Sequence, residues 1–527
     1  MKVGAALANS LWIAAGVPSA RRFSRAIGNA RESQERLLRE MLGRHASSAF
    51  GRQHEFESID SPAEFARRVP LATYDAYAPQ IDRVIAGERD VLACGRVTHL
   101  APTSGSTSAA KLIPFTTSLQ QAFNRAVNAW MFDLVRQRPG LLSGPAYWSI
   151  SPLATNTGAG EGCAPHVPIG FADDADYLGG TSAALVRRIL AVPSEIRHVG
   201  DASAFWRLTL LSLLRQRDLR LISVWHPSFM ELMVTEAGAA WAELLDAIES
   251  GTCPWQSHVN PSQAWMTRAD APRARELQRI GAQNWSRWWP HLQVLSCWGE
   301  QAAESGYREL VRQLPGILVQ AKGLLATEAV VTIPWQGSTP LALTSHYFEF
   351  IDERGSVCGA HQLERGHTYE VVVTTDGGFW RYRLGDMVEC TGHLAATPVL
   401  RFLGRAGRVS DLRGEKISEA FVASVLGALW EQQARPAYVA LRARNGDGGA
   451  RYELLVSSDR DCGADAQLAH RADSALASNP HYATARRLGQ LAPVTVVSVE
   501  PDWSRERLRV TALRLGDTKP DLLFRAD

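Results

Sequence analysis

The sequence lacks the features by which several large classes of protein are identified. Among its 527 residues, 56 are Lys or Arg and 54 are Asp or Glu, so the chain has no basic excess of the kind that a nucleic-acid groove needs. Its seven cysteines form no C-x-x-C pair, and their odd number and scattered positions predict reduced thiols rather than a zinc site. No apolar run is long enough to span a bilayer. We therefore expect a cytoplasmic protein with neither a nucleic-acid nor a membrane partner.

Tandem repeats, low-complexity tracts and the P-loop pattern G-x-x-x-x-G-K-[ST] are also absent, and the last absence disfavours a kinase-type or GTPase-type site. A hydrophobic content of 46% and a charged content of 21% are typical of a globular protein, and the length predicts two or more domains. Residues 3–20 are interrupted by Asn9, Ser10 and Trp12 and are followed by Arg21 and Arg22. This order predicts an amphipathic helix rather than a signal peptide.

A hydroxyl-rich loop is the most informative stretch that is present. It reads Thr103-Ser104-Gly105-Ser106-Thr107-Ser108-Ala109-Ala110-Lys111, between a predicted strand at 97–100 and a predicted helix at 119–135. Backbone N–H groups and hydroxyls in such a loop can face a polyphosphate, and Lys111 adds a positive charge. A polar surface loop is the alternative for this stretch taken alone.

Two acidic residues lie near the ends of predicted strands. Glu328 follows Thr327 between strands predicted at 317–321 and 329–333, and a carboxylate beside a hydroxyl suits a hard cation that bridges phosphate oxygens. Asp386 follows a hairpin signal at 376–378. One carboxylate has two acceptor oxygens, so it can hold both hydroxyls of a ribose. Taken alone, Thr327-Glu328 is a pair of a kind common on protein surfaces, and Gly385-Asp386 is typical of a simple turn.

A third candidate lies where the predicted strand at 221–224 meets Pro227. Trp225 and His226 stand there, and strand ends of this kind line ligand crevices in open α/β sheets. The alternative is that both side chains belong to the core or its rim. The surrounding region, 120–291, has a helical pattern rich in tryptophan, which suits a pocket for a small hydrophobic or aromatic molecule.

The order of these motifs resembles one known family. F-G-R at 50–52, F-x-x-x-V-P at 65–70, a tyrosine-containing segment at 74–79, the hydroxyl loop, Thr327-Glu328 and Y-R-L-G-D at 382–386 follow one another. This order is similar to that of the acyl acid amido synthetases, the Gretchen Hagen three family of auxin-responsive plant proteins and their bacterial relatives, within the acyl-adenylate-forming superfamily. The chain departs from the pattern at Ser108, Ala110 and Leu324, where glycine, proline and an adenine-stacking aromatic are usual.

The resemblance implies an α/β fold with mixed sheets in a large N-terminal domain at 1–403, a hinge at 404–408, and a small mobile C-terminal domain at 409–527. The C-terminal pattern itself predicts an α+β module. A helix begins after Ser418, and strands are predicted at 437–443, 452–457 and 494–499.

The resemblance also implies a reaction. ATP activates a carboxylic acid as an acyl-adenylate with release of pyrophosphate, and an amine, usually that of an amino acid, then displaces AMP to give an amide. The implied roles are as follows: Thr103, Ser104, Gly105, Ser106, Thr107, Ser108 and Lys111 hold the β- and γ-phosphates, Thr327 lies near the α-phosphate, Glu328 binds Mg²⁺, Asp386 and Arg405 bind ribose, and Lys416 and Lys519 offset charge at the α-phosphate.

Two alternatives to this function stay open from the sequence. One is a ligase of the same fold that transfers the acyl group to a thiol such as CoA. The other is a non-catalytic protein that binds ATP or the acid, which the altered loop and Leu324 would suit. In each case we expect small-molecule partners and a monomer.

Overall fold

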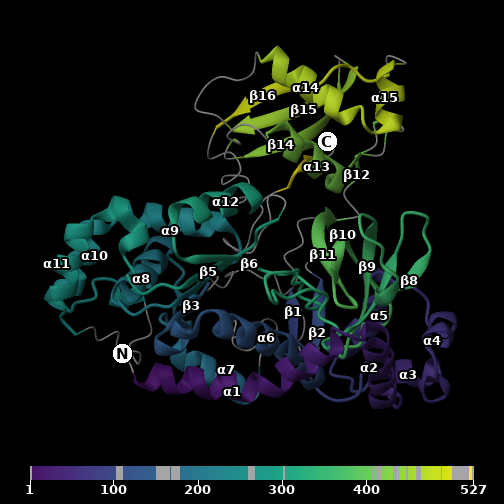
Figure 1. Cartoon of the computed structure of the whole chain (residues 1–527), viewed down its shortest axis with the longest axis horizontal. Helices are drawn as coiled ribbons and strands as arrows, with labels where there is room; N and C mark the ends of the chain where they lie inside the picture. Colours follow the sequence, from purple (N-terminus) through teal and green to yellow (C-terminus); the bar gives the residue numbers. More distant parts are fainter. Residues whose placement is uncertain are drawn as a thin grey trace.

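The computed structural model describes residues 3–102, 111–149, 167, 179–258, 268–300, 303–405, 409–410, 412–413, 415, 417–430, 436, 438–446, 449–457, 465–487, 490–500 and 521–524. Figure 1 shows a broad body built from the first four hundred residues, with a smaller C-terminal module above it. The body contains two main sheets. One lies amid the long helices, and the other lies on the side where α2 to α5 pack.

The first sheet is fully parallel and has four strands in the order of the chain. They are β3 (Ala146–Trp148), β4 (Leu221–Ser223), β5 (Val294–Cys297) and β6 (Leu318–Ala321). Nearly every residue of β3 to β5 is buried, as in a sheet covered on both faces. Successive residues of each strand enter different hydrophobic cores, because side chains alternate across a sheet.

Helices cover both faces of this parallel sheet. The core on one face includes α8 (Ala202–Leu214), α9 (Pro227–Ala239), α10 (Trp241–Ser250), α11 (Ala271–Ile280) and α12 (Glu304–Gln313). The core on the other face includes α1 (Val3–Ala26), α6 (Thr117–Gln137) and α7 (Gly180–Ile189). The carboxyl ends of the strands stay at one edge, which is where ligands bind in open α/β sheets.

The second sheet is antiparallel, with strands in the order β11-β10-β9-β7-β8. Its strands are β7 (Tyr347–Ile351), β8 (Val357–Gly359), β9 (Thr368–Thr374), β10 (Tyr382–Leu394) and β11 (Thr397–Arg405). One continuous core joins it to α2 (Ala30–His45), α3 (Ala49–Gln53), α4 (Pro62–Arg68), α5 (Tyr74–Ile85) and the antiparallel pair β1 (Val97–Pro102) and β2 (Leu112–Thr116). Short 3-10 helices complete the body: η1 (Phe56–Ser58), η2 (Pro139–Ser143), η4 (Ser194–His198), η5 (Gln256–His258), η6 (Ala282–Arg287) and η8 (Ala360–Gln362).

The C-terminal module has a hydrophobic core of its own. A four-stranded sheet in the order β16-β15-β14-β17 packs against three helices. The elements are β12 (Val409–Ser410), β13 (Ile417–Ser418), α13 (Glu419–Leu429), β14 (Val439–Gly446), β15 (Gly449–Ser457), α14 (Ala466–Leu476), α15 (Pro480–Arg487), β16 (Thr495–Val499) and β17 (Leu523–Phe524).

Most predicted elements are confirmed, one predicted strand is wrong, and one strand was missed. The helix predicted at 119–135 is α6, and Ser418 caps α13 by accepting a hydrogen bond from Phe421 N at 3.2 Å. No strand was predicted for β2. The strand predicted at 329–333 is wrong, because this buried run makes only isolated bridges. β11 continues past the domain boundary predicted at 403, through Gly404 and Arg405, and Arg405 still pairs with Asp386.

Candidate active site

Four charged side chains from distant parts of the chain interact at one place. Arg405 Nε lies 3.3 Å from Asp386 Oδ1, across the β10–β11 pairing. Burial raises the pKa of the Glu328 carboxyl, and the charge of Asp386 adds to this rise. A backbone hydrogen bond and the charges of Arg405 and Lys111 oppose it. Glu328 and Asp386 are both buried. The charges of Lys111, Asp386 and Arg405 therefore all act on the Glu328 carboxyl, and Asp386 and Arg405 form an ion pair, while the roles of the four residues stay predictions.

The donor set suits a cation that is held mainly by a substrate. Two buried carboxylates that repel each other, as Glu328 and Asp386 do, gain from a positive charge between or beside them. Among the described residues no group of three or more His, Cys, Asp or Glu is placed to hold a metal by itself. Mg²⁺ often uses one or two carboxylates together with substrate phosphates, so these residues fit that ion only when a nucleotide is bound.

A bulge in β10 turns Asp386 toward Arg405. The pairing of β10 with β9 jumps from Arg383 to Met387, while Asp386 stays in register with β11. Gly385 lies inside the jump with φ of 77°, a conformation that residues with a side chain rarely adopt. Bulges of this kind re-aim the neighbouring side chain. Gly385 is thus the residue that the Y-R-L-G-D motif needs at this point.

The N-terminal motifs hold the beginning of β10. Tyr77 of α5 accepts a hydrogen bond from Trp380 N at 3.1 Å and donates one to Trp380 O. The Arg381 guanidinium donates to the carbonyl oxygens of Ala66 and Val69, at 2.9 and 2.8 Å. Ala66 and Val69 belong to the F-x-x-x-V-P motif. The N-terminal motifs therefore hold in place the start of the strand that carries Asp386.

Tyr74 fixes the residue that follows Lys111. Its hydroxyl accepts a hydrogen bond from Leu112 N at 2.8 Å and donates one to Leu112 O at 3.2 Å. The Lys111 ammonium lies 5.4 Å from the centre of the Tyr74 ring, within the range of a cation–π contact. Burial raises the pKa of Tyr74, and the charge of Glu328 contributes to the rise. Sequence reasoning noted a tyrosine-containing segment here and missed this role, which no local pattern indicates.

Trp225 and His226 lie at the carboxyl end of β4, and they do different things. His226 begins α9, because its Nδ1 accepts a hydrogen bond from Ser228 N at 3.2 Å, so a structural role accounts for its position. Trp225 packs on Trp298 with ring centres 5.6 Å apart, and the ammonium of Lys322 lies 4.4 Å from the Trp225 ring centre. Lys322 is only 7% exposed. Sequence reasoning missed Trp298 and Lys322, although Lys322 directly follows the strand predicted at 317–321.

The remaining predicted site residues divide into two groups. Thr327 lies in a bend immediately before Glu328 and is half-buried. Thr103, Ser104, Gly105, Ser106, Thr107, Ser108, Lys416 and Lys519 lie outside the described residues. Predictions about the roles of this second group therefore stay predictions.

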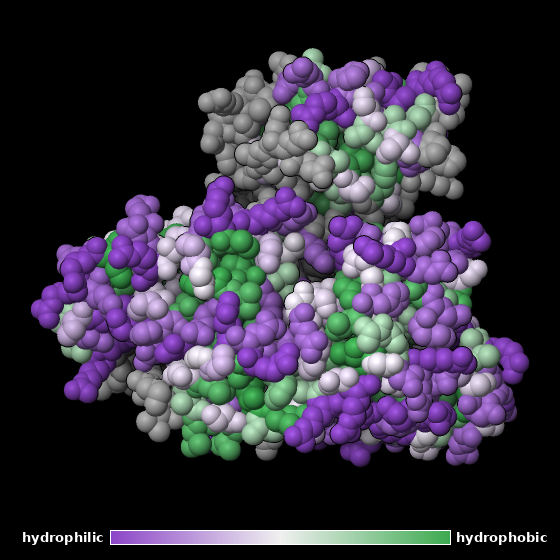
Figure 2. All heavy atoms as spheres, viewed as in Figure 1, coloured by the Kyte–Doolittle hydropathy of each residue, from purple (hydrophilic) through white to green (hydrophobic). Residues whose placement is uncertain are grey.

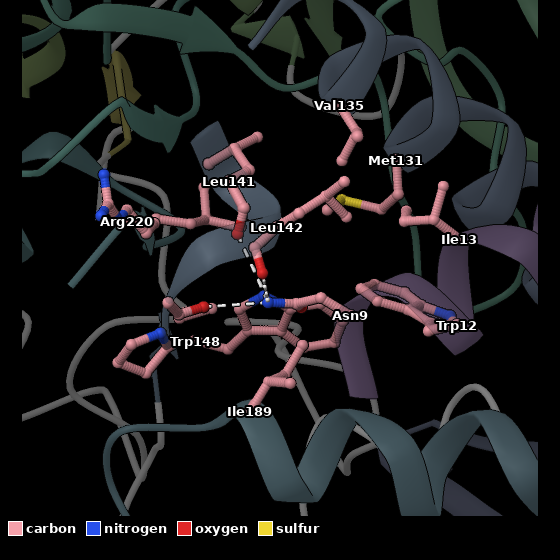
Figure 3. A pocket seen from close by; sticks show the side chains of 14 residues that line it. Asn9, Trp12, Ile13, Met131, Val135, Leu141, Leu142, Trp148, Ile189 and Arg220 are labelled. Atoms are coloured by element: carbon pink, nitrogen blue, oxygen red, sulfur yellow. Dashed lines mark hydrogen bonds between the residues drawn. The ribbon is translucent and has the colours of Figure 1, made fainter. Parts of the chain in front are cut away.

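A pocket elsewhere in the body contains none of the predicted site residues. It lies between α1, α6 and the beginning of β3 and β4, with Asn9, Trp12, Met131 and Arg220 in its wall (Figure 3). The Asn9 amide donates hydrogen bonds to the carbonyl oxygens of Leu141, Leu142 and Gly144. These bonds attach α1 to the amino-terminal edge of the parallel sheet, opposite the edge that carries Trp225.

Comparison with known proteins shows the family. Residues 19–317 match the GH3 family N-terminal domain, and residues 339–405 match the GH3 family central domain. The chain belongs to the GH3 family. One relative of this GH3 protein is the putative indole-3-acetic acid-amido synthetase GH3.10 of Oryza sativa subsp. japonica, 25% identical over 449 residues that cover 79% of this chain and 88% of the relative. Another is the indole-3-acetic acid-amido synthetase GH3.4 of Arabidopsis thaliana, 23% identical over 419 residues, which cover 73% and 69% of the two chains.

Solved structures show the same fold. A GH3.15 acyl acid amido synthetase in complex with 2,4-DB superposes with a TM-score of 0.81 at 18% identity, covering 96% of this GH3 protein and 94% of that chain. A 2-hydroxyisobutyryl-CoA ligase in the postadenylation state has a TM-score of 0.54 at 13% identity, covering 93% and 88%. The family resemblance, the acyl-adenylate-forming α/β fold and the acyl acid amido synthetase class of enzyme are therefore confirmed.

Proposed function

We propose that this GH3 protein uses ATP and Mg²⁺ to join a small hydrophobic or aromatic carboxylic acid to the amino group of an amino acid. The acid is first converted to an acyl-adenylate with release of pyrophosphate, and the amine then displaces AMP. The observation that carries the proposal is the convergence of Lys111, Glu328, Asp386 and Arg405 on one place from four separate segments. A nucleotide has a charged phosphate tail and a sugar, and these four residues offer charged partners for both.

The nucleotide would lie along the four charged groups. Asp386 accepts hydrogen bonds from both ribose hydroxyls, and Arg405, whose Nε lies 3.3 Å from Asp386 Oδ1, holds the carboxylate in place. Residues 103–108 and Lys111 take the β- and γ-phosphates, and Thr327 lies near the α-phosphate. Enzymes of phosphoryl and adenylyl transfer gain most of their rate from positioning and charge neutralisation, which these residues provide.

Glu328 would hold Mg²⁺ together with phosphate oxygens. Burial opposes ionisation of this carboxyl, and a bound divalent cation favours the ionised form, so nucleotide and metal would bind together. The metal, when bound, neutralises charge on the phosphates. The protein residues do the rest, because they orient the two oxygens between which the α-phosphorus is transferred.

The acid would bind at the carboxyl ends of β4, β5 and β6. Trp225 and Trp298 offer two aromatic surfaces there, and the buried ammonium of Lys322 offers a counter-charge for a carboxylate. A planar or hydrophobic acid matches such a lining. The names of the relatives, which are indole-3-acetic acid-amido synthetases, agree with this class of acid.

The C-terminal module would supply Lys416 and Lys519 to the reacting phosphate. The buried Glu415 carboxylate anchors the loop before Lys416, because it accepts hydrogen bonds from Leu412 N and Arg413 N, both at 2.7 Å, and from the Tyr452 hydroxyl. We further propose the division into 1–403, a hinge at 404–408 and 409–527. The ribose contact Arg405 then lies inside the hinge, next to any movement of the module. We also propose that the protein is a cytoplasmic monomer.

The first half-reaction provides the test. Carboxylate-dependent exchange of label between pyrophosphate and ATP, measured across a panel of aromatic and aliphatic acids, should be positive for at least one acid. Absence of exchange with every acid, in a protein that unfolds cooperatively, would contradict the proposal. The mass of the final product then distinguishes an amide from a thioester. An amide would support transfer to an amine, and a thioester would support transfer to CoA.

A further inference from the structure

The outer face of α1 is unusually apolar for a surface helix. Leu7 is 60% exposed and Leu11 is 51% exposed, and only Val311 and Val357 join them as large exposed hydrophobic residues in the part of the chain that the structure describes. Leu7 and Leu11 are four residues apart, so they lie on one face of the helix. Exposed Ala14 continues the same face. Hydrophobic residues gather along the lower edge of the molecule in Figure 2, where α1 lies in Figure 1.

The other face of α1 is firmly attached to the body. Trp12 is 2% exposed and Phe23 is fully buried. Asn9 donates its three hydrogen bonds to the body from this side, as Figure 3 shows. The leucines therefore face outward because the helix is held in this orientation, and a rotation that buried them would expose Trp12 and Asn9.

A positive charge follows the apolar part on the same face. Residues 3–20 contain no charged side chain, and the exposed positions then run from Pro18 to Arg21 and Arg25. Within the described parts of the chain neither Arg21 nor Arg25 has an ion-pair partner, whereas Arg22 pairs with Glu40 at 3.1 Å. The face thus changes from apolar to cationic along a single helix.

We propose that this strip, made of Leu7, Leu11, Ala14, Pro18, Arg21 and Arg25, docks the protein on an anionic lipid surface. A surface helix whose leucines point outward can insert them at the level of the headgroups, and the two guanidiniums then meet lipid phosphates. The strip revises the sequence-based expectation of no membrane partner, but only for a peripheral contact. Among the described residues no helix is long and apolar enough to cross a membrane.

A second copy of the chain fits this strip less well than lipid does. A stable interface between proteins buries about 800 Å² per partner, and a strip one helix wide with two large side chains supplies much less. Docking through α1 leaves the C-terminal module on the opposite side of the body, free to serve the active site (Figure 1).

The test is sedimentation of the full-length protein with vesicles. The wild type should bind vesicles of phosphatidylcholine and phosphatidylglycerol and should leave vesicles of phosphatidylcholine alone unbound. Replacing both leucines in one variant (Leu7→Gln with Leu11→Gln) should lower the partition coefficient about tenfold. The matched control is Val311→Gln, which removes an exposed apolar residue from α12 and should bind as the wild type does.

A second variant tests the charge. Arg21→Gln with Arg25→Gln should lower binding about tenfold at low salt and flatten its salt dependence, because counter-charge attraction falls off with ionic strength. Thermal unfolding and pyrophosphate exchange should match the wild type in all these variants. Failure of the wild type to bind anionic vesicles, or equal binding by the leucine variant, would overturn the proposal. So would a wild-type dimer that the leucine variant converts to monomer, since the strip would then be an interface between copies.

Discussion

At the scale of single residues, the role of Asp386 can be tested most directly, because the same two strands also carry a suitable control residue, Glu389. Asp386→Ala should raise the KM for ATP about tenfold or more, since the ribose hydroxyls lose a charged acceptor. Glu389→Ala removes the carboxylate of the neighbouring β10–β11 ion pair, with Arg401, and should leave the KM for ATP unchanged. Steady-state kinetics with cooperative unfolding as a check on the fold decide the matter. Unchanged ATP kinetics in Asp386→Ala would remove the ribose assignment.

Tyr74 is a positioning residue in this scheme, and its hydroxyl can be removed alone. Tyr74→Phe keeps the ring under Lys111 and loses both hydrogen bonds to Leu112. We expect the turnover of pyrophosphate exchange to fall about tenfold, because the end of the phosphate loop is no longer fixed. Tyr369→Phe is the control, because it also removes a tyrosine hydroxyl that bonds to the backbone. The hydroxyl of Tyr369, a residue of β9, accepts a hydrogen bond from Glu364 N at 3.0 Å. Equal losses in both variants would mean a general effect on stability.

At the scale of elements, the bulge in β10 makes a prediction about backbone conformation alone. A Cβ at Gly385 would meet no atom within 4 Å, so Gly385→Ala meets no steric barrier except the positive φ of 77°. The strain should cost about 1 kcal/mol of unfolding free energy and should raise the KM for ATP through Asp386. Gly43→Ala, inside α2 and equally free of contacts, should stabilise slightly. Urea unfolding and ATP kinetics measure both effects; a Gly385→Ala variant with wild-type values would show that the bulge does not orient Asp386.

The elements also show which parts of the fold a sequence reveals. The helix after Ser418 was predictable because a cap and a period of 3.6 coincide there. β2 was missed because Pro114 interrupts a short run directly after a polar loop, and proline argues against a paired strand. The segment 329–333 was predicted as a strand because it is continuously apolar. Such a run indicates burial, and burial alone does not distinguish a strand from irregular backbone.

The candidate site divides in the same way. Lys111, Glu328, Asp386 and Arg405 were predictable from motifs whose order along the chain is informative. Tyr74 and Lys322 were not, because their importance depends on partners that are brought close only by the folded chain. A motif is a local pattern in the sequence. The hydrogen bonds between Tyr74 and Leu112 join residues thirty-eight positions apart, so they are visible only in the folded structure.

At the scale of the whole molecule, stability should depend on pH through a buried histidine. Burial lowers the pKa of His346 from 6.5 to about 3; the charge of Asp376 opposes this shift and that of Arg125 adds to it. His346 is fully buried, and its Nε2 accepts a hydrogen bond from Val330 N at 3.2 Å, so the folded protein needs the neutral ring. Its neighbours include Phe123 of α6 and Phe348 of β7, which belong to one core.

The sign of the effect follows from proton binding. Between pH 6.5 and about pH 3 the unfolded chain binds a proton at His346 that the folded chain does not, so folding is favoured above this window and loses stability as the pH falls through it. The unfolding free energy should decrease by up to about 1.4 kcal/mol per pH unit from this group alone. His346→Gln, which keeps an acceptor and cannot titrate, should show a flatter dependence in urea unfolding between pH 7 and pH 5, a range that lies above the ordinary pKa of carboxylates. Parallel curves for variant and wild type would show that another group controls acid stability.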